Sequence, residues 1–223
     1  MVKTWSADNP KAALMTRKRE LIVSAALQIF LENGYAESSV NRIAAEAGVS
    51  IKTLYRHFES KDDLFSAVMH AACESAGDES TTTHQLLSGQ PNLPSWFNEA
   101  PVIALPIAGA EYLQHVLSEK QLALYRVVTR DAHRFPELGR RYQEEVTGKR
   151  DAVFASYLDK WVPTTHWKVA DKRGAAVVFA ALLTAGMLNE TLHGSKVPSE
   201  DELAKQADAA TNRMLGLLEA GLL

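Results

Sequence analysis

The chain has 223 residues, of which 46% are hydrophobic and 23% are charged, and its formal net charge is −3. These values are ordinary for a soluble globular protein with one or two domains. A single cysteine excludes an intramolecular disulfide framework, and no apolar run approaches the ~18 residues that span a bilayer. We therefore expect a cytoplasmic protein without a membrane partner, whose global charge gives no sign of what it binds.

The N-terminal part of the chain predicts short helices that follow one another closely. Residues 1–16 are expected to form a flexible arm. Apolar side chains between Ile22 and Phe30 recur at the spacing of one helical face, and Gly34 can end that helix. The pattern repeats over a shorter second helix from Val40 to Ala47, which Gly48 can close because glycine adopts the left-handed conformation readily.

A third and a fourth helix follow directly. Ser50 is the expected N-cap of the third helix, and Leu54 and Phe58 stack one turn apart on its buried side. The segment Ser60–Asp63 resembles a capping box, with Asp in place of the usual Glu, and it opens the fourth helix. The third helix has too few residues to be stable alone, so its neighbours must hold it.

The rest of the chain predicts longer helices after an irregular stretch. Glycines, prolines and a Thr triplet interrupt the helical rhythm over residues 77–101. Helical patterns then cover residues 102–118, 120–135, 136–162 and 168–193. Ser199 opens a last helix with a full capping box. Since strand signals are nearly absent, the sequence predicts an all-α protein with about nine helices.

The outward side of the third helix carries hydrogen-bond donors and planar rings. Lys52, Thr53 and Arg56 point away from the buried stripe, and Tyr55 and His57 flank them. On an ordinary helix this face would simply be solvated. Here it follows a small-residue helix and a glycine turn, which is the pattern of a helix-turn-helix.

A helix-turn-helix places its second helix in the major groove of duplex DNA. Lys52 can donate to guanine, and Thr53 can contact a base edge or a thymine methyl group. Tyr55, His57 and Lys61 are better placed for phosphates, and Arg56 suits either role. The sequence therefore predicts a DNA-binding surface, and this prediction depends on where the basic residues lie and not on the net charge of the chain.

Residues from about 17 to 69 resemble the N-terminal DNA-binding domain of the TetR family of bacterial transcriptional regulators. The matching segments are AALQIFLENGYAESSV, RIAAEAGVS and TLYRHFESKDDLF, in this order and spacing. The resemblance implies a tetracycline-repressor-like, homeodomain-like three-helix domain over residues 17–62 and a helical ligand-binding and dimerisation domain over residues 63–223. It also implies a homodimer that binds a double-stranded DNA operator and releases it when a small-molecule effector binds.

Carried over by position, the resemblance assigns DNA contacts on the second, third and fourth helices. Ser39 and Arg42 match positions that touch the DNA backbone. The recognition-helix contacts correspond to Ser50, Lys52, Thr53, Tyr55 and His57, and Lys61 corresponds to a phosphate contact. Ile51 and Lys52 occupy positions that vary within the family, so the resemblance does not imply which bases are read.

Two further surfaces are expected in the C-terminal part. A ligand pocket needs apolar and aromatic walls with a few polar groups, and the candidate residues are Trp96, Phe97, Tyr112, His115, Tyr125, Arg126, Phe154, Tyr157, Trp161 and Phe179. Apolar residues of the last helix recur in a heptad-like stripe, which can pack on its own domain or on a second subunit. With the resemblance, we expect a dimer interface of Val178, Leu182, Ala185, Leu203, Ala207, Ala210, Met214 and Leu217.

The sequence gives no pattern for a metal site, a cofactor or an enzyme. No His-x₃-His pair, glycine-rich phosphate loop, nucleophile elbow or zinc-protease motif is present. A DNA-binding repressor is therefore the leading hypothesis. The alternative is a helical small-molecule-binding or enzyme bundle whose N-terminal head makes protein contacts.

Overall fold

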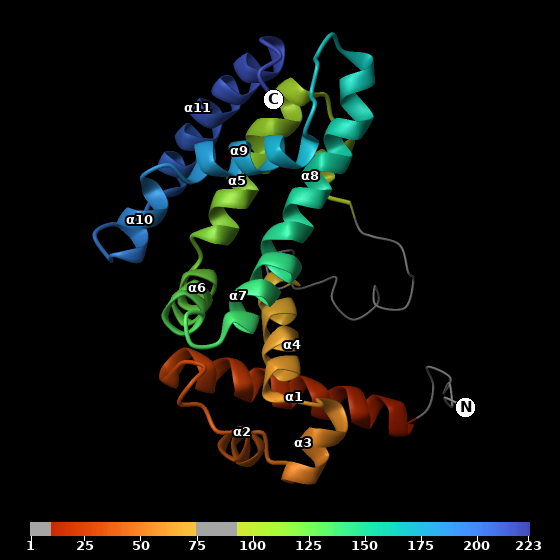
Figure 1. Cartoon of the computed structure of the whole chain (residues 1–223), viewed down its shortest axis with the longest axis vertical. Coiled ribbons are helices and arrows are strands. Elements are labelled where there is room, and N and C mark those ends of the chain that lie inside the picture. Colours follow the sequence, from red (N-terminus) through yellow and green to blue (C-terminus); the bar gives the residue numbers. More distant parts are fainter. Residues whose placement is uncertain (1–9, 75–92) are drawn as a thin grey trace. The chain divides into compact units, whose positions relative to one another are not determined.

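The computed structural model describes residues 10–74 and 93–223, and the regular elements of these residues are all helices (Figure 1). The all-α class expected from the sequence is confirmed. The chain divides into two compact units, which we call the head unit, Met1–Ser75 with Ala123–Val146, and the body unit, Ala76–Leu122 with Thr147–Leu223.

The head unit contains six helices or parts of helices. They are α1 (Pro10–Asn33), α2 (Val40–Glu46), α3 (Ile51–His57), α4 (Lys61–Glu74), α6 (Glu119–Asp131) and α7 (Pro136–Tyr142). The first residues of α6 precede Ala123 and belong to the body unit. One apolar core joins the four N-terminal helices to the later pair, since Phe30 and Phe65 are buried in the same cluster as Leu124 and Val128.

Two features of the head unit differ from the sequence expectations. The expected arm, residues 1–16, is helical from Pro10 onward, and its first nine residues lie outside the described part of the chain. The expected boundary at residue 62 does not separate the compact units, because α4 packs on α1 and on α7. The reason is physical: Leu64, Phe65 and Val68 of α4 are buried in the head core.

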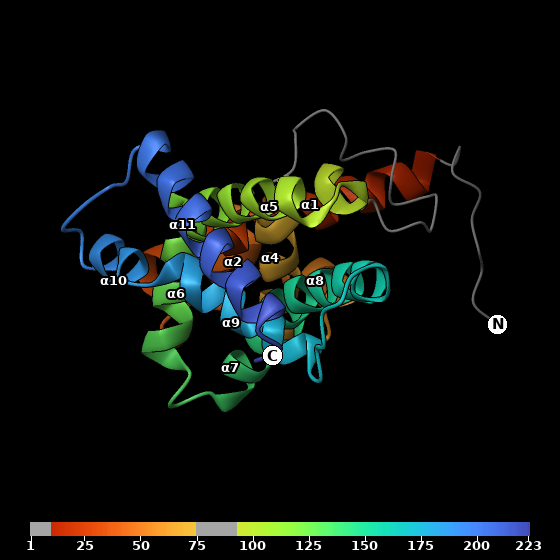
Figure 2. The ribbon, with the colours of Figure 1, turned by 90° about the horizontal axis from the view of Figure 1, so that it is seen from above.

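The body unit holds the remaining helices. They are two short 3₁₀ helices (Ser95–Asn98 and Val162–Thr164), α5 (Pro101–Val116), α8 (Gly148–Trp161), α9 (Lys172–Thr184), α10 (Met187–Leu192) and α11 (Glu200–Glu219). Seen from above, α11 lies against both α5 and α9 (Figure 2). The Ser199 capping box opens α11 as the sequence predicts, with both reciprocal hydrogen bonds present.

Two helices expected to be continuous are divided. The expected helix 136–162 consists of α7, a π-helical turn over Gln143–Thr147 and α8. The expected helix 168–193 is broken into α9 and α10 at Gly186, whose φ of 79° is left-handed and cannot continue a helix. Because of these breaks, the helix numbering runs to α11 over the described residues, where about nine helices were expected.

The heptad-like stripe of α11 packs on its own unit. Leu203, Ala207, Ala210 and Met214 are all buried in the body core, with Met214 at 0% exposure. These four positions were expected at a dimer interface, but they face α5 and α9 of the same chain. Ala207 contributes to this packing directly, because a side chain on Gly109 of α5 would meet it.

A different face of the body unit is open to solvent. On α9, Val177 is 54% exposed, and Ala181 and Ala185 follow it at one-turn intervals, both exposed. The expected interface residues Val178 and Leu182 lie beside this row and are half-buried. Leu217 of α11 is also half-buried. Within residues 10–74 and 93–223, no helix is long and apolar enough to cross a membrane.

Candidate functional site

The turn between α2 and α3 fixes how α3 leaves the head. Gly48 has a φ of 64°, and its amide donates to the Ala45 carbonyl at 3.1 Å, while the Val49 amide donates to the Ala44 carbonyl at 2.9 Å. This is the hydrogen-bond pattern of a glycine-terminated helix. An added Cβ at Gly48 would meet no atom within 4 Å, so the backbone conformation alone favours glycine here.

The next helix is held at its start and along one side. The Ser50 hydroxyl caps α3 by accepting from the Thr53 amide at 3.1 Å. Leu54 and Phe58 are each 1% exposed and anchor the helix in the head core, as the sequence predicts. A helix this short is therefore rigid because of its cap and its two buried side chains.

The opposite side of α3 presents polar side chains to solvent. Lys52, Tyr55 and Arg56 are exposed, and Thr53 is half-buried with its hydroxyl 2.9 Å from that of Ser50. No carboxylate of the described residues forms an ion pair with Lys52 or Arg56. The Arg56 guanidinium donates a hydrogen bond to the Met15 sulfur at 3.3 Å. No acidic side chain of the described residues forms an ion pair that would compensate the positive charge on this face.

His57 lies in a cluster of cations at the junction of α1 and α3. Burial lowers its pKa, and the nearby charges of Arg56, Arg19 and Lys18 lower it further. The His57 Nε2 atom is buried and has no hydrogen-bond partner within the described part of the chain. Arg19 is fixed over the Phe58 ring, 4.5 Å from its centroid. Three cations gathered beside a histidine donor, with no ion pair to an acidic side chain among the described residues, match what a DNA phosphate requires.

Lys18 and Arg19 were not among the residues expected to contact DNA. The run Arg17–Arg19 was the available signal, but on a long helix such a run is usually a solvated face. Only the packing of α1 on α3 brings these two side chains to His57.

The α2 candidates occupy the start of that helix. Ser39 is exposed and is the N-cap of α2, yet its side chain makes no capping hydrogen bond. Arg42 is exposed and is held by α1, with its guanidinium 3.2 Å from the Asn33 side-chain oxygen and 3.7 Å from Glu32. Both side chains are therefore available at the surface of the helix-turn-helix.

Lys61 lies differently from the expected phosphate contact. Its ammonium group sits 4.3 Å from the centre of the Tyr35 ring and donates to the Ala36 carbonyl at 3.4 Å. Burial lowers the Lys61 pKa, and the charges of Asp131 and Asp62 oppose that effect. In this conformation the side chain stabilises the turn between α1 and α2 and does not extend toward solvent.

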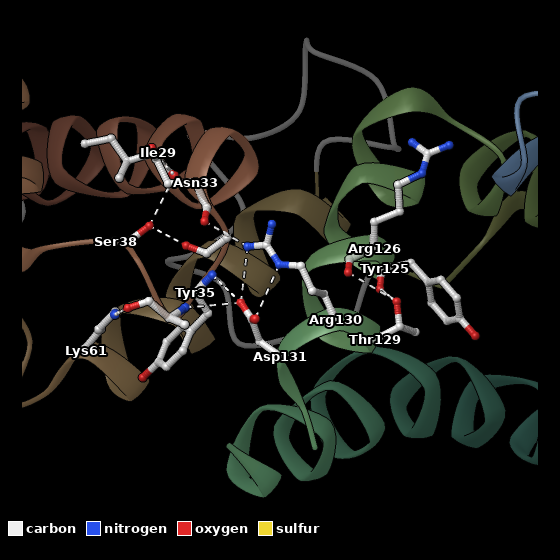
Figure 3. Close-up of polar contacts among 12 residues, drawn as sticks. Ile29, Asn33, Tyr35, Ser38, Lys61, Tyr125, Arg126, Thr129, Arg130 and Asp131 are labelled. Carbon is white, nitrogen blue, oxygen red and sulfur yellow. Dashed lines mark hydrogen bonds and ion pairs between the residues drawn. The ribbon is translucent and has the colours of Figure 1, made fainter. Parts of the chain in front are cut away.

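The same turn is held by the end of α6 (Figure 3). Asp131 is 4% exposed and accepts hydrogen bonds from the backbone amides of Tyr35 at 2.7 Å and Ala36 at 3.2 Å. Arg130 donates to the Asn33 carbonyl at 2.9 Å and also pairs with Asp131. The Tyr35 hydroxyl in turn donates to Asp62 of α4. A polar network thus fixes the position of α2, and hence α3, on the head.

The residues expected to line a ligand pocket do not form one group. Tyr125 and Arg126 lie on α6 within the head unit, where Tyr125 packs edge-on against Tyr142. Most of the others gather in the body core around Tyr157, as a cluster of stacked and edge-on rings: Trp96, Phe97, Phe154, Trp161 and Phe179. Trp96 and Phe97 are buried parts of this cluster.

Several polar atoms in the body unit are buried without a partner. The Trp161 indole nitrogen and the Thr211 hydroxyl have none within the described part of the chain, and neither does Nε of Arg150. Arg150 lies over the Tyr112 ring, 5.0 Å from its centroid, and its charge helps lower the pKa of the half-buried His115 to about 4, with desolvation as the larger cause. Sequence reasoning missed Arg150, since an arginine on a helix gives no sign of pointing inward.

In the described ranges, no three His, Cys, Asp or Glu side chains are grouped to hold a metal ion. The arrangement that the geometry does provide is a rigid cationic helix on the head and an aromatic core with unpaired donors in the body. The first is suited to nucleic acid and the second to a small molecule.

Two family models match the chain. Residues 22–68 match the bacterial regulatory proteins of the tetR family, and residues 104–217 match the C-terminal domain of AefR-like transcriptional repressors. The HTH-type transcriptional repressor BepR of Brucella suis is 28% identical over 187 residues, which cover 80% of this chain and 82% of BepR.

Solved structures agree with these matches. A TetR-family transcriptional regulator from Mesorhizobium loti is 28% identical, with a TM-score of 0.71 over 91% of this chain and 97% of that one. The flavonoid-responsive regulator FrrA is 27% identical, with a TM-score of 0.73 over 90% of this chain and 96% of that one. With the second model covering half of the chain, the protein belongs to the TetR family and is a DNA-binding transcriptional regulator.

Proposed function

We propose that this protein is a ligand-responsive repressor of the cytoplasm, which binds a palindromic operator as a homodimer and is released by a small hydrophobic effector. The observation that carries the proposal is the outward face of α3, where Lys52, Tyr55 and Arg56 are exposed and lack acidic partners within the described chain. The neighbouring cations of α1 extend the same face toward the DNA backbone.

A homodimer is supported by the open side of α9. The row of Val177, Ala181 and Ala185 is exposed on a helix whose other side is buried, and small residues permit a second helix to approach closely. An isologous pair places two copies of α3 on one duplex, where half-sites recur about 34–36 Å apart. In this proposal the interface is formed by α9 and the outer side of α11, and the buried α11 stripe supports it from within.

Effector binding is supported by the composition of the body core. Its aromatic cluster is accompanied by buried donors without partners, namely Trp161 Nε1, Thr211 Oγ1 and Arg150 Nε. Each unpaired buried donor costs about 1–3 kcal/mol, which a ligand can recover. The name of FrrA describes that protein as flavonoid-responsive, and that of BepR describes a repressor.

The proposal is tested by selecting DNA sites from a random duplex library with the purified protein. The selected site should be palindromic, should bind two protomers in fluorescence anisotropy and ultracentrifugation, and should lose affinity linearly in log–log plots against salt. Binding by one protomer, or to no preferred sequence, would contradict the proposal. A panel of hydrophobic compounds should contain at least one that both raises the melting temperature and releases the DNA.

A further inference from the structure

The row of α8 side chains that faces the core begins with a charged residue, Arg150. Phe154, Tyr157 and Trp161 follow one another at helical spacing and enter the aromatic core. Arg150 lies one turn before Phe154, on the same face of the helix. Its guanidinium therefore points to the side of α8 that faces the core, and Lys149 beside it is exposed.

The surroundings of Arg150 contain rings and further donors but no paired carboxylate. Tyr112 of α5 lies under the guanidinium, and His115 is one turn further along α5. Asp151, the next residue, makes no ion pair with Arg150; burial raises the Asp151 pKa, and the charges of Arg150 and Arg173 act to lower it. Lys120 adds to the positive charge that acts on His115. Arg150 as a whole is half-buried, and the hydroxyl of Tyr112 is a hydrogen-bond partner of its side chain.

One N–H group of Arg150 is left without a hydrogen-bond acceptor among the described residues, which costs free energy in the folded state. Its Nε–H is buried and has no acceptor within residues 10–74 and 93–223, although an arginine fork is well suited to two parallel bonds with a carboxylate. Water or a neutral acceptor can satisfy a single N–H group, but only an anion also compensates the charge. A planar anionic ligand would satisfy the Nε–H group and the charge together.

We propose that the effector of this regulator is a small amphiphilic molecule with one carboxylate group, which Arg150 binds between Tyr112 and His115, while its apolar part lies against the aromatic cluster of α8. The inference rests on the proposed effector function and names the chemical class of the ligand. His115 is neutral near pH 7, because burial first and the cations Arg150 and Lys120 second hold its pKa at about 4. It can therefore donate one hydrogen bond to the ligand without adding a second charge.

The test uses two matched pairs of probes on the full chain: naphthalene-2-carboxylate with its primary amide, and decanoate with its primary amide. Binding is measured by calorimetry and melting temperature for the wild type, for Arg150→Met and for Lys149→Met, which removes the exposed neighbouring charge. We expect at least one carboxylate to bind the wild type and Lys149→Met alike. Arg150→Met should weaken it by about 10- to 100-fold, with no change for the amide.

Several outcomes would overturn the inference. They are equal binding of acid and amide, an Arg150→Met protein that binds the acid as well as the wild type does, or no binding of either acid at about 1 mM. If Arg150→Met does not fold, Arg150→Lys replaces it and must weaken the acid alone, because lysine lacks the planar fork. Operator binding is measured in parallel: if neutral compounds release the DNA, the repressor proposal stands without the anionic ligand, whereas no operator binding removes both.

Discussion

Replacing Asp131 should loosen the turn that supports the recognition helix. Its buried carboxylate accepts the amide hydrogens of Tyr35 at 2.7 Å and Ala36 at 3.2 Å, and the Arg130 guanidinium lies against it. Asp131→Asn keeps the size of the side chain and one acceptor oxygen, but it removes the charge. The substitution therefore tests the charge-assisted part of the network with little change in packing.

The expected magnitude follows from the number and kind of bonds. Hydrogen bonds to a charged group contribute about 1.5–3 kcal/mol each, and an amide left unpaired in a buried site costs a similar amount. Since the asparagine still accepts one bond, we expect a loss of about 1.5–3 kcal/mol for Asp131→Asn. At about 1.4 kcal/mol for each factor of ten, the Tyr35 and Ala36 amides should exchange about 10- to 100-fold faster.

Hydrogen exchange read by mass spectrometry on peptides that span residues 31–40 measures this effect locally. Glu46→Gln is a matched control, because Glu46 is an exposed carboxylate of the same unit. The pH dependence supplies a second readout. Burial acts to raise the Asp131 pKa, but the hydrogen bonds from Arg130, Ala36 and Tyr35 outweigh it and hold the pKa below its ordinary value. A depressed folded-state pKa stabilises the protein above about pH 4, and the difference from Asp131→Asn should shrink as pH falls below that value. Unchanged exchange at Tyr35 in the variant at pH 7 would refute the reasoning.

Three further predictions concern DNA binding, the turn and the dimer. Lys52→Ala should change the preferred base at one operator position, whereas Lys18→Ala should weaken all sites alike and reduce the salt slope by about 1, as measured by anisotropy. Gly48→Ala should lower the free energy of unfolding by about 1–2 kcal/mol in urea titrations, because an alanine resists the φ of 64° while its Cβ meets no atom. Val177→Glu should give a folded monomer in ultracentrifugation. Met214→Glu should instead unfold the body unit, since Met214 is fully buried. A folded monomer from Met214→Glu would contradict this and would place the apolar stripe of α11 at the dimer interface.

The sequence predicted the helix-turn-helix well because its signals are local. The Ser50 cap, the Gly48 turn and the burial of Leu54 and Phe58 each depend on residues a few positions apart. The packing of α6 on the four N-terminal helices could not be predicted from local signals. Tyr35 and Asp131 are 96 positions apart, and no local sequence pattern around either residue indicates that they are in contact. The internal role of Lys61 was missed for a similar reason, because the Ala36 carbonyl that it contacts is 25 positions away.

Periodicity also shows which face of a helix is apolar, but it does not show which element packs on that face. The stripe through Ala207 and Met214 fits a second subunit as well as it fits α5, and only the packed structure shows that α5 covers it. Arg150 illustrates the converse problem. A charged side chain is expected in solvent, so the buried Nε–H group of Arg150 is found only when the side of α8 that faces the core is known.

The composition of the head core has a consequence for building hybrid regulators. Leu124, Val127, Val128 and Leu138 belong to the same buried cluster as the four N-terminal helices, although they come from a distant part of the chain. Grafting residues 1–75 alone onto a foreign effector domain would leave that cluster incomplete. A transplant that retains its sequence preference should carry residues 123–146 as well, so that two separate pieces of the gene are exchanged together.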